Sequence, residues 1–295
     1  MTTRLRGCGT ALITPFTTRG AIDEPALRAL VDWQIDEGIH MLVPCGSTGE
    51  AVTLSLDEHK LVVEIVVDQA RGRVPIIAGA GSNDTRRAIA LSALMRGAGA
   101  THLLHVSPMY NKPPQRGIIA HFTAIAGETD LPIVVYNVPG RTGSNIEART
   151  TLALAEVNGI VAVKEASGNL SQVHEILRGR PAHFAVLSGD DSLTLAMMAA
   201  GADGVISVTS NATPKKMAAL CDCAAAGDLP GARALHEELV PWMEGAFCES
   251  NPIPVKAGVS MLGRCQNVLR LPLVPLAADK EPVVRAALRA AGAIA

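Results

Sequence analysis

The sequence predicts an α/β fold, a (β/α)8 TIM barrel with a C-terminal helical extension. Three observations support this prediction. Short apolar runs rich in Val and Ile alternate with helix-period segments, eight such runs occur before residue 209, and only Ala- and Leu-rich helical segments follow residue 212. Strands buried on both faces of a parallel sheet form continuous apolar runs of this kind, and eight strand–helix units are typical of a closed barrel.

Each predicted strand is a short apolar run that leads into a turn containing Gly, Ser or Pro. In chain order the strands cover residues 8–14, 40–45, 74–80, 101–107, 131–137, 160–166, 183–189 and 203–208. An open, doubly wound sheet is the alternative architecture. A dinucleotide-binding sheet of that type would carry G-x-G-x-x-G after its first strand, but this chain has TPFTTRG there.

Helix signals lie between the strands. Asp23 precedes an acidic residue and a proline, which is a typical helix start, and Ser55 and Glu58 have the spacing of a capping box. We expect residues 1–227 to form the barrel with the active site and residues 228–295 to form a helical region packed on it, since no low-complexity linker separates the two. The last helical segments cover residues 213–226, 229–247, 252–263 and 279–292.

The composition excludes several classes of protein. The 295 residues are 48% hydrophobic, with 26 basic and 28 acidic side chains and a net charge of −2, so neither disorder nor a nucleic-acid or membrane surface is expected. The start of the chain lacks the apolar core of a secretory signal. Six scattered cysteines show no zinc-ligand spacing and fit small buried residues in a reducing compartment, so we expect a cytoplasmic protein.

Active sites of (β/α)8 barrels lie at the carboxyl ends of the strands, so polar residues at predicted strand ends are the candidates. Lys164 ends a run of four apolar residues and is one of only seven lysines. Burial disfavours the ammonium ion, and a lysine that is neutral near neutral pH can form a Schiff base with a ketone or aldehyde. The alternative is a structural lysine whose ammonium is paired with a carboxylate.

The chain has two tyrosines, and both lie at strand ends. Tyr136 closes the fifth predicted strand, and Tyr110 lies in the loop after the fourth. A phenol relays protons when a second hydroxyl hydrogen-bonds to it, and imine chemistry needs such a relay. Packing residues with satisfied hydroxyl groups are the alternative interpretation.

Two loops are suited to binding carboxylates. Segment 46–50 (GSTGE) follows the second strand, and its backbone N–H groups and the hydroxyls of Ser47 and Thr48 fit an anion, although Ser47 and Glu50 also have capping-box spacing. Arg141 lies on a loop shaped by Pro and Gly, where it either binds a carboxylate in bidentate fashion or is solvated. A weaker candidate is the backbone of residues 204–208, which could line the floor of a pocket. The pair Asp190-Asp191 could bind a cation, but Asp191 is better explained as a helix start.

Four motifs make the chain similar to a known family. From Gly9 to about Leu276 it resembles the dihydrodipicolinate synthase / N-acetylneuraminate lyase family of class I, Schiff-base aldolases, and within that family the synthase branch. Segment 46–50 is common to the wider family. The more specific motifs are YNKP at 110–113, YNVPGRT at 136–142, VKEASG at 163–168 and NPIPVK at 251–256.

The resemblance implies a lyase that condenses pyruvate with L-aspartate 4-semialdehyde to 4-hydroxy-tetrahydrodipicolinate in lysine and diaminopimelate biosynthesis. Lys164 would form a covalent imine with pyruvate, without any metal or organic cofactor. Tyr110 would reach into a neighbouring subunit's site, which implies a homo-oligomer, a dimer of dimers. The implied catalytic residues are Lys164, Tyr136, Ser47 and Tyr110, and the implied substrate-binding residues are Thr48, Arg141, Ile206 and Gly189.

The chain departs from the family pattern in two places. Ser47 stands where the synthase usually has threonine, so the hydroxyl is kept but the methyl group that restricts its rotamer is lost. Positions matching a lysine-binding regulatory pocket are also changed: Arg87 replaces a usual glutamate and repels a lysine ammonium, which predicts weak or absent lysine feedback. The six matching positions are Ala51, Leu56, His59, Asn83, Arg87 and Met109.

Two other functions remain open. One is a pyruvate-dependent aldolase or dehydratase acting on a 2-keto-3-deoxy sugar acid, and the other is a non-catalytic protein that binds 2-oxo acids. Arg141 favours a short acceptor that ends in a carboxylate over a sugar acid. The presence of Lys164 together with both tyrosines argues against a non-catalytic role.

Overall fold

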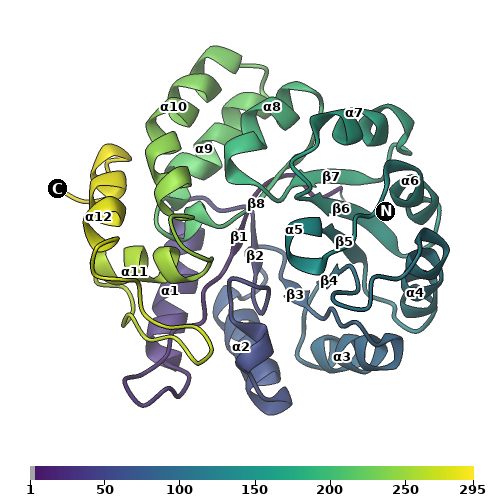
Figure 1. Cartoon of the computed structure of the whole chain (residues 1–295), viewed down its shortest axis with the longest axis horizontal. Helices are drawn as coiled ribbons and strands as arrows, with labels where there is room; N and C mark the ends of the chain where they lie inside the picture. The colour runs from purple at the N-terminus through teal and green to yellow at the C-terminus, as the bar shows by residue number, and fades with distance from the viewer. Residues whose placement is uncertain (1–3) are drawn as a thin grey trace.

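The computed structural model describes residues 4–295, so the first three residues of the expected barrel unit lie outside the described part (Figure 1). Strands and helices alternate through most of the chain, as the sequence predicts. The strands are β1 (Gly7–Ala11), β2 (Met41–Val43), β3 (Ile77–Gly79), β4 (His102–Val106), β5 (Ile133–Asn137), β6 (Ile160–Glu165), β7 (Ala185–Ser188) and β8 (Gly204–Ser207). The helices are α1 (Glu24–Asp36), α2 (Leu56–Ala70), α3 (Thr85–Gly97), α4 (Gln115–Gly127), α5 (Pro139–Thr142), α6 (Ala148–Ala155), α7 (Leu170–Gly179), α8 (Thr194–Ala199), α9 (Pro214–Ala225), α10 (Leu229–Gly245), α11 (Ile253–Met261) and α12 (Glu281–Ala290).

The eight strands form one parallel sheet that closes into a barrel. The strand order is β2-β1-β8-β7-β6-β5-β4-β3, with parallel pairing throughout. The two ends of this order meet through the parallel bridge between Leu42 and Ile76, supported by a hydrogen bond from the Leu42 amide to the Pro75 carbonyl (3.0 Å). The closed barrel is therefore confirmed, and the open sheet considered from sequence is wrong.

Alternation along the strands separates two cores. The inner core fills the barrel and includes Val134, Ala162, Leu187 and Ile206, whereas the larger outer core lies between the sheet and the helices. Successive side chains of a strand point to opposite faces. Lys164, two residues after Ala162, therefore points into the barrel.

The helix starts predicted from sequence are present. Asp23 caps α1 by accepting a hydrogen bond from the Ala26 amide, and Ser55 and Glu58 form the complete capping box at the start of α2. These caps satisfy amide groups that have no partner within the first turn of a helix. The helix starts fix where the β2–α2 loop ends, and that loop carries Ser47 and Thr48.

The C-terminal helices pack directly on the barrel. α10 lies against α9 and α12, and α11 packs on α12 (Figure 1). Trp242 of α10 is fully buried, and its indole Nε1 donates to the Thr209 carbonyl, beyond the end of β8, at 3.0 Å. As a result, the end of α10 and the chain that follows it lie at the carboxyl ends of the barrel strands.

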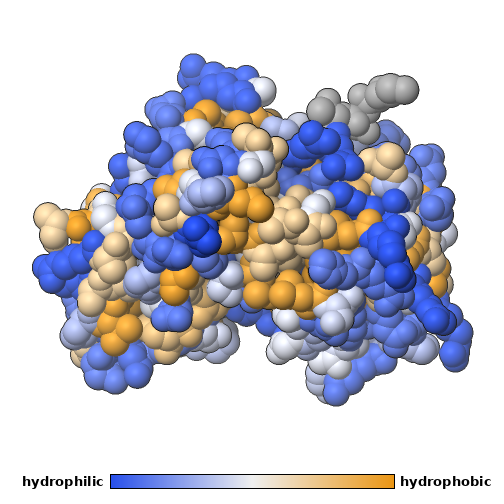
Figure 2. All heavy atoms as spheres, turned by 90° about the horizontal axis from the view of Figure 1, so that it is seen from above, coloured by the Kyte–Doolittle hydropathy of each residue, from blue (hydrophilic) through white to orange (hydrophobic). Residues whose placement is uncertain are grey.

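The surface is mixed in character. Figure 2 shows hydrophilic side chains over much of one face, with hydrophobic ones gathered between them. Among residues 4–295, no helix is long and apolar enough to cross a membrane. The most exposed large apolar side chains are Val52 (92%), Tyr110 (89%) and Leu271 (79%).

Candidate active site

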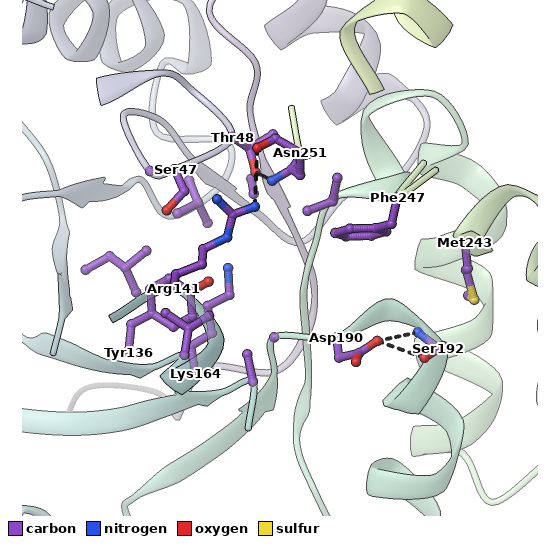
Figure 3. A pocket seen from close by; sticks show the side chains of 18 of the residues that line it. Ser47, Thr48, Tyr136, Arg141, Lys164, Asp190, Ser192, Met243, Phe247 and Asn251 are labelled. Carbon is purple, nitrogen blue, oxygen red and sulfur yellow. Dashed lines mark hydrogen bonds between the residues drawn. The ribbon is translucent and has the colours of Figure 1, made fainter. Parts of the chain in front are cut away.

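A cavity of about 380 Å³ opens at the carboxyl ends of the strands (Figure 3). Its wall includes residues from seven of the eight strands or the loops that follow them, together with residues from α10 and the segment after it. This is the position at which (β/α)8 barrels carry their active sites. Six residues singled out from the sequence line it: Ser47, Thr48, Tyr136, Arg141, Lys164 and Gly189.

Lys164 is the buried amine at the bottom of this cavity. Its side chain is 5% exposed, and its Nζ lies 4.3 Å from the centre of the Tyr136 ring. Burial lowers the pKa of Lys164 to about 8; nearby Asp191 opposes this shift, and Arg141 adds to it. Near neutral pH an appreciable fraction of this amine is therefore uncharged and able to attack a carbonyl carbon.

Tyr136 lies beside Lys164 because β5 and β6 pair in register. Residue 136 is directly opposite residue 164 in the parallel ladder, so both side chains point into the barrel. Burial raises the pKa of Tyr136 to about 12, and Arg141 opposes this rise. Tyr136 is therefore a neutral phenol near neutral pH, able to donate a proton and to accept one in exchange.

Gly189 leaves room for the lysine. A Cβ atom added there would lie 3.0 Å from Cε of Lys164 and 2.7 Å from Cβ of Ala166. Contacts this short are tighter than normal packing allows, so a side chain at this position would displace the amine or narrow the cavity.

A hydrogen bond and a left-handed turn fix the backbone of the loop that carries Ser47 and Thr48. The Thr14 hydroxyl donates to the Gly49 carbonyl at 2.7 Å, and Glu50 has a left-handed backbone conformation with φ of 54°. The carboxylate of Glu50 is fully buried in an ion pair with Lys256, so it does not serve the helix cap that its spacing from Ser47 suggested. The capping-box interpretation of this segment is therefore wrong.

Arg141 is positioned by a residue from the C-terminal region. Its Nη2 donates to the main-chain carbonyl of Asn251 at 3.2 Å, and the Asn251 side-chain amide donates to the Thr48 hydroxyl at 3.0 Å (Figure 3). Asn251 thus joins the two groups expected to bind carboxylates. Asn251 belongs to the 251–256 motif of the family resemblance, but the sequence did not mark it as a site residue.

Further residues line the cavity opposite Lys164. Asp190 accepts hydrogen bonds from the amide (3.1 Å) and hydroxyl (2.8 Å) of Ser192, and Phe247 reaches the wall from the segment after α10 (Figure 3). Glu244 of α10 also lines the cavity. Asp190 was among the weaker candidates from sequence, but no periodicity marks Glu244 and Phe247, because helical segments after the last strand carry no indication of which end of the barrel they cover. Only the segment 251–256 motif indicated that the C-terminal region contributes to the site.

The expectation that Asp191 starts a helix needs correction. Asp190 is the residue that caps the short helix Asp191–Leu193, whereas the Asp191 carboxylate accepts hydrogen bonds from the amides of Val208 (2.9 Å) and Thr209 (3.1 Å). Asp191 is 2% exposed, and burial raises its pKa. It therefore ties the end of β8 to the chain after β7, within electrostatic reach of Lys164.

Comparison with known proteins places this site in a family. The model of the Dihydrodipicolinate synthetase family matches residues 4–291. The chain belongs to this family. A 4-hydroxy-tetrahydrodipicolinate synthase of Oleidesulfovibrio alaskensis is 50% identical over 289 residues, which is 98% of this chain and 99% of that protein.

Solved structures of family members match over nearly the whole chain. The chloride-inhibited dihydrodipicolinate synthase of Acinetobacter baumannii complexed with pyruvate is 42% identical with a TM-score of 0.96, covering 98% of this chain and 99% of that one. The enzyme of Cyanidioschyzon merolae with lysine bound is 38% identical with a TM-score of 0.96, covering 99% and 100%. The resemblance recognised from sequence motifs is confirmed, as is the fold that it implied.

Two residues that the family resemblance assigned to the site lie outside the cavity wall. Tyr110 is 89% exposed, has a φ of 74°, and is attached to the last residue of α5 by a hydrogen bond from its amide to the Thr142 carbonyl (3.1 Å). Ile206 is fully buried in the inner core of the barrel. Within one copy of the chain, Tyr110 is therefore exposed and lies outside the cavity.

The positions matched to the family's lysine pocket fall into two groups. Ala51, His59 and Met109 line a second cavity of about 100 Å³ that shares Ser47 and Tyr136 with the first. In His59 the ring Nε2 lies 2.8 Å from the Gly79 carbonyl, and burial lowers its pKa. The other three positions, Leu56, Asn83 and Arg87, are exposed on the surface.

Proposed function

We propose that this chain is a Schiff-base aldolase that condenses pyruvate with L-aspartate 4-semialdehyde to 4-hydroxy-tetrahydrodipicolinate, in lysine and diaminopimelate biosynthesis. The observation that carries the proposal is the buried Lys164 amine beside Tyr136, in a cavity that also contains Arg141 and the Ser47–Thr48 hydroxyls. The names of the family members that match nearly the whole chain support the same reaction.

In the first step, the neutral amine of Lys164 attacks the keto carbon of pyruvate, and water leaves as the imine forms. The pKa of Lys164, lowered to about 8 by burial, supplies that neutral amine. The pyruvate carboxylate binds to the hydroxyl and amide groups of the loop that carries Ser47 and Thr48. Thr48 is already oriented by the hydrogen bond from Asn251.

In the second step, the imine draws electrons from the neighbouring methyl group, which loses a proton and becomes an enamine. The imine of Lys164 thus takes the role of an electron sink, and we propose that no metal or organic cofactor is required. Tyr136 and Ser47 carry the proton, with Tyr110 of a second copy as the outer member of the relay. The high pKa of Tyr136, about 12, suits a group that exchanges protons without remaining ionised.

In the third step, the enamine carbon attacks the aldehyde carbon of aspartate semialdehyde, whose carboxylate is bound by Arg141. A guanidinium donates two parallel hydrogen bonds to a carboxylate, which fixes the aldehyde over the enamine. The amine of the bound acceptor then replaces Lys164 on the keto carbon. This closes the ring and releases the lysine for the next turnover.

Self-association completes the site in this proposal. Tyr110 is almost fully exposed, and so is Val52, which lines the second cavity beside Ala51. Large apolar groups exposed in this way indicate an interaction surface. We propose a homodimer in which each copy supplies Tyr110 to the other, assembled as a dimer of dimers. All six cysteines are free in this fold, which fits the proposed cytoplasmic location.

A coupled assay tests the proposed function. Purified chain is mixed with pyruvate and L-aspartate 4-semialdehyde, and a reductase that consumes the product reports turnover by NADPH oxidation. We expect turnover by the wild type and by Lys215→Met, which changes an exposed lysine, but none by Lys164→Met. Faster turnover with a sugar-derived aldehyde in place of aspartate semialdehyde, or an active Lys164→Met variant, would contradict the proposal.

A further inference from the structure

The outer face of β5 and β6 carries a polar pair directly behind the catalytic candidates. In the parallel ladder Tyr136 is opposite Lys164, and the next residues, Asn137 and Glu165, are opposite each other. Because side chains alternate along a strand, the first pair points into the barrel and the second points outward, toward the surrounding helices. Both outward residues are buried, with exposures of 0% and 2%.

Glu165 is a buried carboxylate held by neutral donors. It accepts hydrogen bonds from Asn137 Nδ2 (3.0 and 3.2 Å), from Gln172 Nε2 of α7 (3.1 Å) and from the Ser167 amide (2.7 Å). Among residues 4–295, no cationic side chain forms an ion pair with it. Burying an ionised group away from cations is costly, and an apolar residue would fill this part of the outer core at lower cost.

Asn137 also closes the loop that carries Arg141. Its Oδ1 accepts a hydrogen bond from the Ile146 amide (2.9 Å), and its Nδ2 donates to the side-chain oxygen of Asn145 (2.8 Å). Asn137 and residues 145–146 lie at the two ends of the loop that contains α5. One side chain therefore holds both ends of that loop together and also bonds to Glu165.

We propose that Asn137 and Glu165, together with Gln172, form an outer-face clamp that positions the catalytic machinery without touching substrate. The clamp fixes the carboxyl ends of β5 and β6 against each other, which keeps Tyr136 beside Lys164. Through Asn137 it also fixes the base of the loop that carries Arg141. The inference rests on the proposed function, because it assigns its effects to imine formation at Lys164 and to acceptor binding at Arg141.

Substitutions separate the roles of Glu165 and Asn137 in the clamp. Glu165→Gln keeps the size of the side chain, but its amide offers a single oxygen to three donors, so at least one donor faces an N–H group. Asn137→Ala removes the hydrogen bonds between Asn137 and Glu165, and it also removes the bonds that close the base of the Arg141 loop. The first change should slow imine formation, and the second should in addition raise the KM for the aldehyde acceptor.

A paired substitution tests the contact itself. Asn137→Asp places two carboxylates together, whereas Asn137→Asp combined with Glu165→Gln restores a donor and an acceptor with their roles exchanged. Val163→Ala is the matched control, because Val163 lies on the same strand and points to the same outer face. Its side chain packs in the outer core and forms no hydrogen bond to the clamp. Each variant is compared at full chain length by melting temperature, steady-state kinetics, and the rate and final yield of borohydride trapping with pyruvate.

We expect Glu165→Gln to lower kcat and the trapping rate about 10- to 100-fold while the final yield stays at one pyruvate per chain, because displacements of about 1 Å have effects of this size. Val163→Ala should lower the melting temperature but leave both rates within about twofold, since it does not displace the reacting groups. The double variant should be faster than Asn137→Asp alone.

Two outcomes would overturn the clamp. One is a Glu165→Gln or Asn137→Ala variant that forms the imine and binds the acceptor as well as the wild type. The other is a loss of rate that Val163→Ala reproduces at an equal loss of melting temperature. Both presuppose an active wild type. A wild type that neither forms the imine nor condenses the two substrates would instead refute the proposed function.

Discussion

Replacing Lys164 by methionine should stabilise the protein while abolishing its activity. Burial lowers the pKa of this lysine from 10.5 to about 8, so the folded state binds the proton less tightly than the unfolded chain does. That difference in proton affinity corresponds to about 3 kcal/mol of lost stability at pH 7. Methionine keeps the length and apolar character of the side chain and removes the amine, so it removes this cost.

The effect depends on pH in a defined direction. Because the folded-state pKa of Lys164 lies below the unfolded value, the cost is fully present below about pH 8, shrinks as the pH rises, and vanishes above 10.5. Differential scanning calorimetry of Lys164→Met and wild type should show a melting temperature about 5 °C or more higher for the variant at pH 7. The gain should disappear above pH 10.5, where the Lys164 amine is neutral in both the folded and the unfolded chain.

The exposed lysine 215 provides the control, because Lys215→Met removes an amine that is not buried. This control should show no gain in melting temperature at either pH. Equal melting temperatures of Lys164→Met and wild type at pH 7 would refute the argument that desolvation lowers the pKa of Lys164. A gain that persists unchanged at pH 10.5 would show that packing, and not charge, is the cause.

Three further results are expected. Lys256→Met leaves the buried Glu50 carboxylate without its cation and should lower the free energy of unfolding in urea by about 3–5 kcal/mol, most of it regained with Glu50→Gln added; an unchanged urea midpoint would contradict this. Burial and the nearby His121 lower the pKa of His105 to about 3. The folded protein therefore keeps its full stability above pH 6.5 and loses about 2 kcal/mol of it at pH 5, where the unfolded chain binds a proton at this imidazole. His105→Gln should make the melting temperature fall less steeply with acid, and an equally steep fall would refute this cause. Titration with lysine should give no sub-millimolar inhibition, because the Arg87 guanidinium repels the ligand ammonium; inhibition at those concentrations would overturn this expectation.

The sequence predicted the site best where a polar residue ends a strand that is otherwise apolar and buried. Lys164 and Tyr136 stood out as polar groups at the ends of apolar runs, and the parallel register brings both to one wall of the cavity. Strand ends were less well predicted. The first strand was expected over residues 8–14, but its ladder ends at Ala11. The Leu12 amide still bonds to the Val43 carbonyl (3.1 Å), whereas the Ile13 amide bonds to the Asn211 side chain (3.0 Å) instead of a strand.

Contacts between distant segments were beyond the reach of the sequence pattern. Asn251 bonds to Thr48 and Arg141 across separations of 203 and 110 residues, and hydrophobic periodicity contains no information on such pairs. Asp191 was misassigned for a related reason. Either of two adjacent aspartates can cap a helix, and which of them does so depends on the amides of Val208 and Thr209, just after β8, that bind the other.

The central claim is that Lys164 forms a covalent imine with pyruvate. Borohydride reduction of the wild-type chain in the presence of pyruvate, followed by peptide mass spectrometry, tests it directly. We expect one reduced pyruvate on Lys164, dependent on added pyruvate and absent from Lys164→Met. The absence of an adduct, or an adduct on another amine such as the ion-paired Lys256, would contradict it.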